Sequence, residues 1–179
     1  MSRLTTTLGI AGAVIALGAV VVGTLVYRQV NPPLPLPLAK LAGTPLTTAL
    51  GSPILLGQAA APAAVTIVSF WAAWCIPCRA EATALARLRQ RYTPSDLAVV
   101  YLNVDTTPDP TATARFLQET HAEGLPVFYA GHAGWLAVTG SKTMVLPRTY
   151  IFDHAGSATA ALAGFDRVKL DDSIAATRR

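Results

Sequence analysis

Two cysteines, Cys75 and Cys78, are the residues of this chain whose spacing most directly indicates chemistry. They are the only cysteines among 179 residues, and they lie in the stretch SFWAAWCIPCRAE, residues 69–81, separated by Ile76 and Pro77. A Cys-x-x-Cys pair can be a redox-active dithiol, half of a metal site or a small structural disulfide. These three interpretations make different demands on the rest of the sequence.

A metal site and a structural disulfide both fit the sequence poorly. Two thiolates are half of a tetrahedral zinc site, and a structural zinc site needs a second pair of Cys or His ligands at short spacing. The histidines stand alone in different segments, as His121, His132 and His154. A disulfide that closes a two-residue loop constrains the unfolded chain very little. We therefore favour a redox-active Cys75–Cys78 pair, with no metal and no other cofactor.

The segments on either side predict how the pair is held. AVTIVSF, residues 64–70, is an unbroken apolar run of strand length, as expected for a strand buried on both faces. RAEATALARLRQRY, residues 79–92, predicts an amphipathic helix that starts near the cysteines, where Pro77 is tolerated. Cys75 would then face the positive end of the helix dipole, which lowers the pKa of its thiol and populates the attacking thiolate. Cys78, one turn later, is placed to resolve a mixed disulfide.

The rest of the domain predicts an α/β sheet. DLAVVYLNVD, residues 96–105, reads as a second buried strand, so strand, helix and strand form a parallel crossover unit. The later elements are expected in this order: a helix over 111–124, a short strand over 125–130, a short helix within 133–140, a β-hairpin that turns at 153–156, and a closing helix or tail over 166–179.

The N-terminal part is apolar and uncharged. LGIAGAVIALGAVVVGTLV, residues 8–26, is long enough, at about 1.5 Å per residue, to cross a hydrocarbon core of roughly 30 Å. No A-x-A cleavage site closes this run, so we expect an uncleaved anchor over 8–27 in the lipid bilayer rather than a cleaved signal peptide. Basic residues flank the run on both sides and do not decide its orientation. A single span ahead of one domain is typical of a signal anchor, which predicts that residues 31–179 lie outside the cytoplasm.

Composition divides the chain into four parts. NPPLPLPLAK, residues 31–40, contains four prolines and favours an extended spacer. The expected organisation is a tail over 1–7, a transmembrane anchor over 8–27, a proline-rich stalk over 28–43 and one domain over 44–179. The formal charge of +4 is scattered along the chain, so we expect a solvated mixed surface and no nucleic-acid partner.

The quoted motifs resemble those of a known fold family. FWAAWCIPCRAE resembles the active-site segment of thioredoxin-fold proteins, and VLPRTYIFDHAG, residues 145–156, looks like their second hallmark, a proline before a β-strand. In that family the proline is cis and packs beside the cysteine pair, and its neighbours bind the substrate backbone. The matching residues are Pro147 and Leu146. Trp74 would shape a hydrophobic docking surface, and the alternative is that it packs in the domain. The resemblance implies a thioredoxin-like α/β fold, a mixed sheet flanked by helices.

Three features narrow the resemblance. The 42 positions from Asp105 to Pro147 leave room for an extra helix and strand before the cis-proline, Glu81 follows Cys78 by three residues, and an anchor precedes the domain. This combination is similar to the TlpA/ResA/CcmG-like membrane-anchored thiol–disulfide oxidoreductases of bacteria. Those proteins act outside the cytoplasmic membrane, mostly as reductases and often in cytochrome c or cytochrome oxidase assembly. The chain departs from them at Thr83, where proline is usual.

The resemblance also implies partners and a location. The substrates would be protein disulfides, and a membrane electron donor of the DsbD/CcdA type would supply electrons, since no nicotinamide or flavin motif is present. The anchor would lie in the bacterial inner membrane, with the domain in the periplasm or otherwise outside the cytoplasm.

Glu81 has two possible roles. It could relay a proton to or from Cys78, and the alternative is a surface carboxylate at the positive end of the helix.

Rival functions are distinguished by single positions. Strong oxidants resembling DsbA tend to carry a histidine between the cysteines, whereas Ile76 adds neither a donor nor a charge, so a reductase is favoured over a disulfide-forming oxidase. Thiol peroxidases of the superfamily place a threonine where this chain has Ala72, and copper-delivery proteins of the fold space their cysteines by three residues. A non-enzymatic adaptor with vestigial cysteines stays an alternative.

Two arginines, Arg79 and Arg148, lie near the site by their positions in the motifs. They could stabilise a thiolate and attract acidic partners, and the alternative is that they are ordinary solvated side chains.

Overall fold

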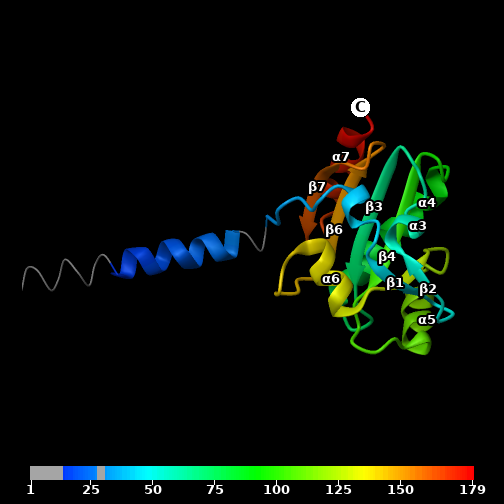
Figure 1. Cartoon of the computed structure of the whole chain (residues 1–179), viewed down its shortest axis with the longest axis horizontal. Coiled ribbons are helices and arrows are strands. Elements are labelled where there is room, and N and C mark those ends of the chain that lie inside the picture. The colour runs from blue at the N-terminus through cyan, green and yellow to red at the C-terminus, as the bar shows by residue number, and fades with distance from the viewer. Residues whose placement is uncertain (1–13, 28–30) are drawn as a thin grey trace, which may run out of the picture.

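The computed structural model describes residues 14–27 and 31–179 (Figure 1). Residues 14–27 are helical, and the large apolar side chains of this segment are exposed. No helix within the described residues is both long enough and apolar enough to cross a membrane. The predicted anchor over 8–27 begins outside the described residues, and the predicted tail over 1–7 and residues 28–30 of the predicted stalk lie wholly outside them.

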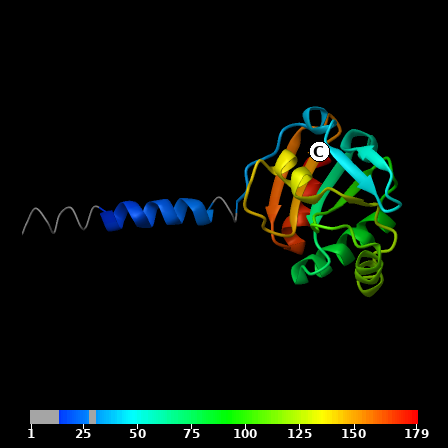
Figure 2. The same ribbon diagram turned by 60° about the horizontal axis from the view of Figure 1, so that its bottom comes forward.

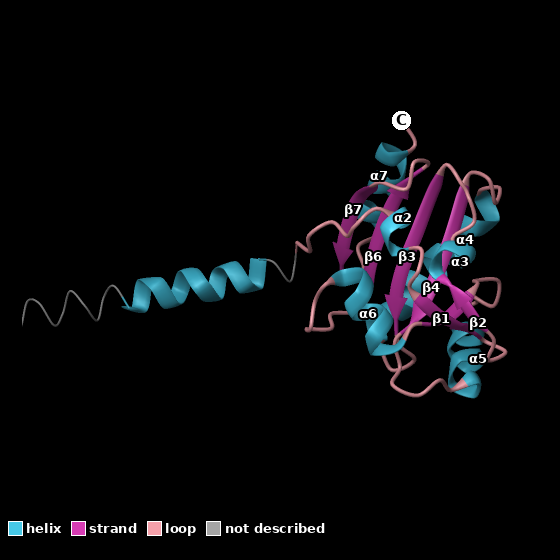
Figure 3. Ribbon diagram, viewed as in Figure 1, coloured by secondary structure: helices cyan, strands magenta, loops and turns pink. Residues whose placement is uncertain are grey.

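A seven-stranded mixed sheet forms the centre of the domain (Figure 3). Its strands are β1 (Pro45–Thr48), β2 (Pro53–Leu55), β3 (Val65–Trp71), β4 (Leu97–Asn103), β5 (Val127–Tyr129), β6 (Arg148–Asp153) and β7 (Ala158–Ala163), in the spatial order β2-β1-β5-β4-β3-β6-β7. β3 pairs parallel with β4, and β4 with β5, whereas β6 and β7 form an antiparallel pair beside β3. The predicted mixed sheet with an antiparallel edge pair is confirmed.

Helices cover both faces of this sheet. They are α2 (Leu38–Leu41), α3 (Leu56–Ala59), α4 (Ile76–Arg91), α5 (Pro110–Glu119), α6 (Gly131–Thr139) and α7 (Arg167–Thr177). Successive side chains of a strand point to opposite faces, and in β3 Trp71 stacks on Phe116 of α5 while Phe70 meets the edge of Trp135 in α6. α4 and α5 therefore lie on one face and α6 on the other (Figure 2).

The buried strand and the helix that follows it were predicted closely. All seven residues of β3 are buried, and Leu85 and Leu88 place the apolar stripe of α4 in the core. α5 instead ends at Glu119, five residues before the end expected from sequence. His121 takes a positive φ of 52°, which lies outside the right-handed helical region, so the helical backbone cannot continue past Thr120.

The segment between the spacer and β3 folds more than its sequence indicated. β1, β2 and α3 were not predicted, because strands of three or four residues that start with proline carry almost no periodic pattern. Residues 38–43, expected as the end of an extended stalk, also pack on the domain. The N–H of Leu38 donates to the carbonyl of Gly156 at 2.8 Å, and Leu41 is buried, because a leucine-containing turn of helix gains stability by covering apolar surface.

Candidate active site

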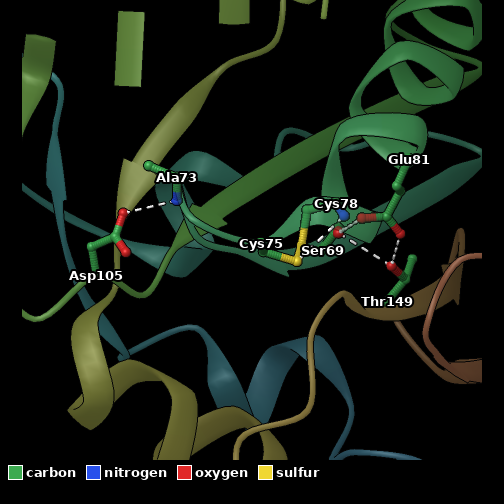
Figure 4. Close-up of a disulfide and its surroundings, with 7 residues drawn as sticks. All are labelled: Ser69, Ala73, Cys75, Cys78, Glu81, Asp105 and Thr149. Carbon is green, nitrogen blue, oxygen red and sulfur yellow. Dashed lines mark hydrogen bonds between the residues drawn. A yellow bond between two sulfur atoms is a disulfide. The ribbon is translucent and has the colours of Figure 1, made fainter. Parts of the chain in front are cut away.

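Cys75 and Cys78 form a disulfide at the N-terminus of α4 (Figure 4). Cys75 is the N-cap of this helix, where its Sγ accepts a hydrogen bond from the N–H of Cys78 at 3.3 Å, and Pro77 lies in the first turn. Cys75 is 3% exposed and Cys78 is fully buried. After reduction, the Cys78 N–H and the helix dipole would both stabilise a Cys75 thiolate, so Cys75 is the sulfur suited to attack.

The loop that presents Cys75 is held by the end of the neighbouring strand. One carboxylate oxygen of Asp105, Oδ2, accepts hydrogen bonds from the N–H of Ala73 at 3.0 Å and from the Asn103 side-chain amide at 2.9 Å. The Asp105 N–H in turn donates to Oδ1 of Asn103 at 2.8 Å. Neither Asn103 nor Asp105 was predicted as part of the site, and their only signal in the sequence is that two polar residues follow one another closely at the end of a buried strand.

Glu81 lies one turn beyond Cys78, on the same side of α4, with its carboxyl group inside the domain (Figure 4). It is 2% exposed, so the alternative of a surface carboxylate is excluded. The Ser69 hydroxyl donates to Oε2 at 2.7 Å, and the Thr149 hydroxyl donates to Oε1. Burial raises the pKa of Glu81 to about 7, and the two hydrogen bonds oppose that shift. A carboxyl group with this pKa can take up and release a proton near neutral pH.

Ser69 and Thr149 face each other in the pairing of β3 with β6. Their hydroxyl groups lie 3.1 Å apart, and both contact Glu81. Neither residue was predicted as part of the site. Ser69 is a polar residue near the end of an apolar strand, and this position could have indicated a role in the site. Thr149 carries no such signal, because only the register of the folded sheet brings it beside Ser69.

The residues assigned by resemblance to substrate docking surround the same end of β3. The Leu146–Pro147 peptide bond is cis, as the resemblance implies. Pro147 is buried one position beyond the pair formed by Phe70 and Arg148, and Leu146 is partly buried against the core. Trp74 and Ile76, the residues on either side of Cys75 in the sequence, are 69% and 79% exposed.

The exposed rings and methyl groups of Trp74 and Ile76 form an apolar rim beside the disulfide. Such a rim suits contact with an apolar or backbone surface of another protein.

The two arginines considered from sequence behave differently. Arg79 is partly exposed and pairs with Glu119 at 2.6 Å, so its charge already has a partner. Arg148 is buried, and its side chain lies on the face of the sheet that α6 covers, opposite the face that holds Glu81.

Thr83 stands where proline is usual in the similar proteins, and α4 is continuous through it. Its hydroxyl lies within hydrogen-bonding distance of the carbonyls of Arg79 and Thr120.

No group of three or more His, Cys, Asp or Glu side chains in the part of the chain that the structure describes is arranged to hold a metal ion.

The fold and the site together define a thioredoxin-fold protein with a Cys-x-x-Cys dithiol, a cis-proline and a buried carboxyl group. A family model described as the AhpC/TSA family matches residues 44–160. The chain belongs to this family, which agrees with the thioredoxin-fold resemblance drawn from its motifs.

Relatives of known name carry the same kind of domain. A thiol:disulfide interchange protein DsbE homolog of Paracoccus denitrificans is 35% identical over 100 residues, which are 56% of this chain and 51% of that protein. The thioredoxin-like protein YneN of Bacillus subtilis is 30% identical over 90 residues, 50% of this chain and 51% of the relative. The chain therefore spans about half the length of these two curated relatives.

A solved structure confirms the fold. A putative thiol:disulfide interchange protein DsbE from Chlorobium tepidum superposes with a TM-score of 0.64 at 21% identity, covering 82% of this chain and 99% of that one. A secreted Mycobacterium tuberculosis disulfide oxidoreductase superposes with a TM-score of 0.59 at 18% identity, covering 75% and 96%. At these identities the likeness concerns the thioredoxin-like fold.

Proposed function

We propose that this chain is a thiol–disulfide oxidoreductase that reduces disulfides in other proteins. The observation that carries the proposal is the position of the Cys75–Cys78 disulfide at the N-cap of α4, one turn before a buried Glu81 with a pKa of about 7. The name of the Paracoccus denitrificans relative, a thiol:disulfide interchange protein, supports thiol–disulfide exchange as the reaction.

In the proposed reaction, the Cys75 thiolate attacks a substrate disulfide and displaces one substrate sulfur as a thiolate. Cys78 then gives up its proton, for which Glu81 is the placed acceptor, and attacks the Cys75 sulfur of the mixed disulfide. The second substrate sulfur leaves as a thiolate. Two electrons have passed to the substrate, whose two sulfurs end as thiols, and the Cys75–Cys78 disulfide has formed.

We infer the direction of electron flow from how few hydrogen-bond donors and cations stabilise the Cys75 thiolate. Among the described residues, the Cys75 sulfur has one donor, the Cys78 N–H. Ile76 points into solvent, and the guanidinium of Arg79 is bound to Glu119. A strong oxidant needs a greatly stabilised thiolate in its reduced form, so these contacts favour a reductase over a disulfide-forming oxidase.

We expect the reduction potential of the domain to lie nearer to the roughly −270 mV of thioredoxin than to the roughly −120 mV of DsbA. Equilibration against dithiothreitol or glutathione, with the thiols quantified by alkylation, measures this value. Replacing Ile76 with histidine adds a donor beside Cys75 and should make the potential more oxidising. A wild-type potential close to −120 mV would reverse the assigned direction and favour the oxidase.

We also propose that the protein is tethered to the bacterial cytoplasmic membrane with its domain outside the cytoplasm. The support is the uncharged run over residues 8–26, together with the exposed apolar side chains of residues 14–27 and the proline-rich spacer that follows. Electrons would then come from a membrane donor of the DsbD/CcdA type. A role in cytochrome c maturation or a related assembly belongs to the same proposal.

The topology predicts a clear result with reporter fusions. A reporter enzyme that is active only outside the cytoplasm, fused after Arg179, should be active and should remain in the membrane fraction after a high-salt wash. Deletion of residues 1–30 should release the fusion from that fraction. Activity of a cytoplasm-only reporter at the same position would contradict the proposed location.

A further inference from the structure

Arg148, the first residue of β6, is a buried cation without an anionic partner among the described residues. It is 5% exposed, and the ion pairs of this part of the chain use other cations: Arg79, Arg167, Lys169 and Arg178. Its Nε has no hydrogen-bond partner, and its guanidinium carbon lies 5.9 Å from the centre of the Trp135 ring.

A guanidinium group keeps its charge in proteins, and a buried charge without a partner costs free energy. Burial accordingly lowers the pKa of Arg148. An anion with acceptor atoms for the free N–H groups would offset the free energy of burying this charge. A carboxylate or a phosphate has such atoms and would suit the site.

A cavity of about 260 Å³ lies against Arg148. Four hydroxyl-bearing residues line it, namely Thr139, Ser141, Thr143 and Tyr150. Tyr150 is on the same face of β6 as Arg148, two residues further along the strand. A guanidinium group beside several hydroxyl-bearing residues is a combination that binds an oxyanion, and the cavity has room for a carboxylate with accompanying water.

The cavity lies at the end of the sheet that also carries the disulfide. Arg148 pairs with Phe70, one position before the end of β3, and Cys75 follows from that end through a loop of three residues. Pro147 directly precedes Arg148, and the family resemblance places the substrate backbone at the neighbours of this proline. A protein whose disulfide engages Cys75 would therefore pass beside the cavity.

We propose that the cavity at Arg148 binds an acidic side chain or a C-terminal carboxylate of the disulfide-bearing protein substrate. This inference rests on the proposed reductase activity and adds to it a substrate class, proteins with a carboxylate near the reducible disulfide. Arg148 would act as a specificity-determining residue, because it contacts the substrate at a distance from the sulfur atoms.

The test compares matched peptides that each contain one disulfide. Members of the set carry glutamate at one, two or three residues on either side of a cysteine, and each has a partner with glutamine at that position. The full chain, kept reduced by dithiothreitol, should reduce at least one glutamate peptide about tenfold faster in kcat/KM than its glutamine partner, since a desolvated charge pair contributes at least that factor. Arg148→Met should lower this ratio to near one, and Arg148→Lys should retain part of it.

Arg87→Met, which removes an exposed arginine from α4, is the matched control and should keep the wild-type ratio. Phosphate should compete more strongly with the glutamate peptide than with its glutamine partner. If Arg148→Met does not fold, three measurements still test whether the cavity binds a substrate carboxylate: the wild-type ratio, the phosphate competition and the ratio of Arg148→Lys.

The outcomes separate this inference from the proposed function. Reduction of neither peptide would overturn the oxidoreductase activity itself. Equal reduction of all pairs by the wild-type chain would overturn the acidic subsite alone. Leu25 of the helical segment also borders the cavity, so vesicles with and without phosphatidylglycerol form a further arm. Arg148-dependent binding to the anionic vesicles without peptide discrimination would overturn the inference in favour of a lipid phosphate.

Discussion

Replacing Cys75 with serine is expected to reduce the rate of insulin disulfide reduction to that of dithiothreitol alone. Serine lacks a thiol that can attack a disulfide, so no mixed disulfide forms. The substitution should remove the thiol and keep the helix cap. Position 75 is the N-cap of α4, and a serine hydroxyl there can accept the same hydrogen bond from the Cys78 N–H. The measurement is the turbidity of precipitating insulin B chain with and without the variant.

Cys78→Ser is the matched control, because it leaves the attacking sulfur in place. This variant should turn over poorly but accumulate a mixed disulfide between Cys75 and its substrate, visible on a non-reducing gel. Circular dichroism should show both variants folded. Equal insulin reduction by wild type and Cys75→Ser would end the catalytic assignment and support the alternative of a thioredoxin-fold adaptor.

Glu81→Gln is expected to make the oxidised protein more stable than wild type at alkaline pH but not at acid pH. The pKa of Glu81 is about 7 in the folded state and 4.5 in the reference state. Between these values the unfolded chain releases the proton while the folded chain keeps it, so the wild type loses stability as the pH rises from 4.5 to 7. At about 1.4 kcal/mol per pKa unit, the loss is about 3 kcal/mol and is complete above pH 7.

Urea unfolding of the disulfide-bonded form measures this difference without interference from thiol titration. Tyr101 on β4 also feels the charge of Glu81, but burial, more than that charge, raises its pKa well above the usual value, so it stays neutral. Glu123→Gln, at an exposed site, is the control and should follow the wild type. A constant stability difference between wild type and Glu81→Gln from pH 4 to pH 9 would contradict the buried, proton-holding carboxyl group.

The same variant should be slower in catalysis. Loss of a placed proton acceptor for Cys78 should lower kcat on the order of 10²-fold. The wild-type rate should have an inflection near pH 7 that is absent in Glu81→Gln. A rate that falls without any change in its pH dependence would indicate that Glu81 only positions the helix.

The sequence predicted the sheet and the dithiol because both depend on local patterns. An uninterrupted apolar run over 64–70 can be satisfied only by burial, and β3 is buried at every position. Cys75 and Cys78 are three residues apart, so a helix start alone brings them together. The hairpin of β1 and β2 escaped prediction because its short strands depend on the sheet that they join, and β1 reaches that sheet through β5.

By itself, then, the sequence determined the thioredoxin-like fold and the redox pair. Tertiary structure alone decided the state of the charged groups, because the cost of a charge depends on what surrounds it and not on its neighbours in sequence. Glu81 has its pKa near 7 because β3 and β6 enclose it and place Ser69 and Thr149 on its carboxyl group. Arg148 precedes Thr149 on β6 and points to the opposite face of the sheet, because successive side chains along a strand alternate. It lies there without a carboxylate partner among the described residues.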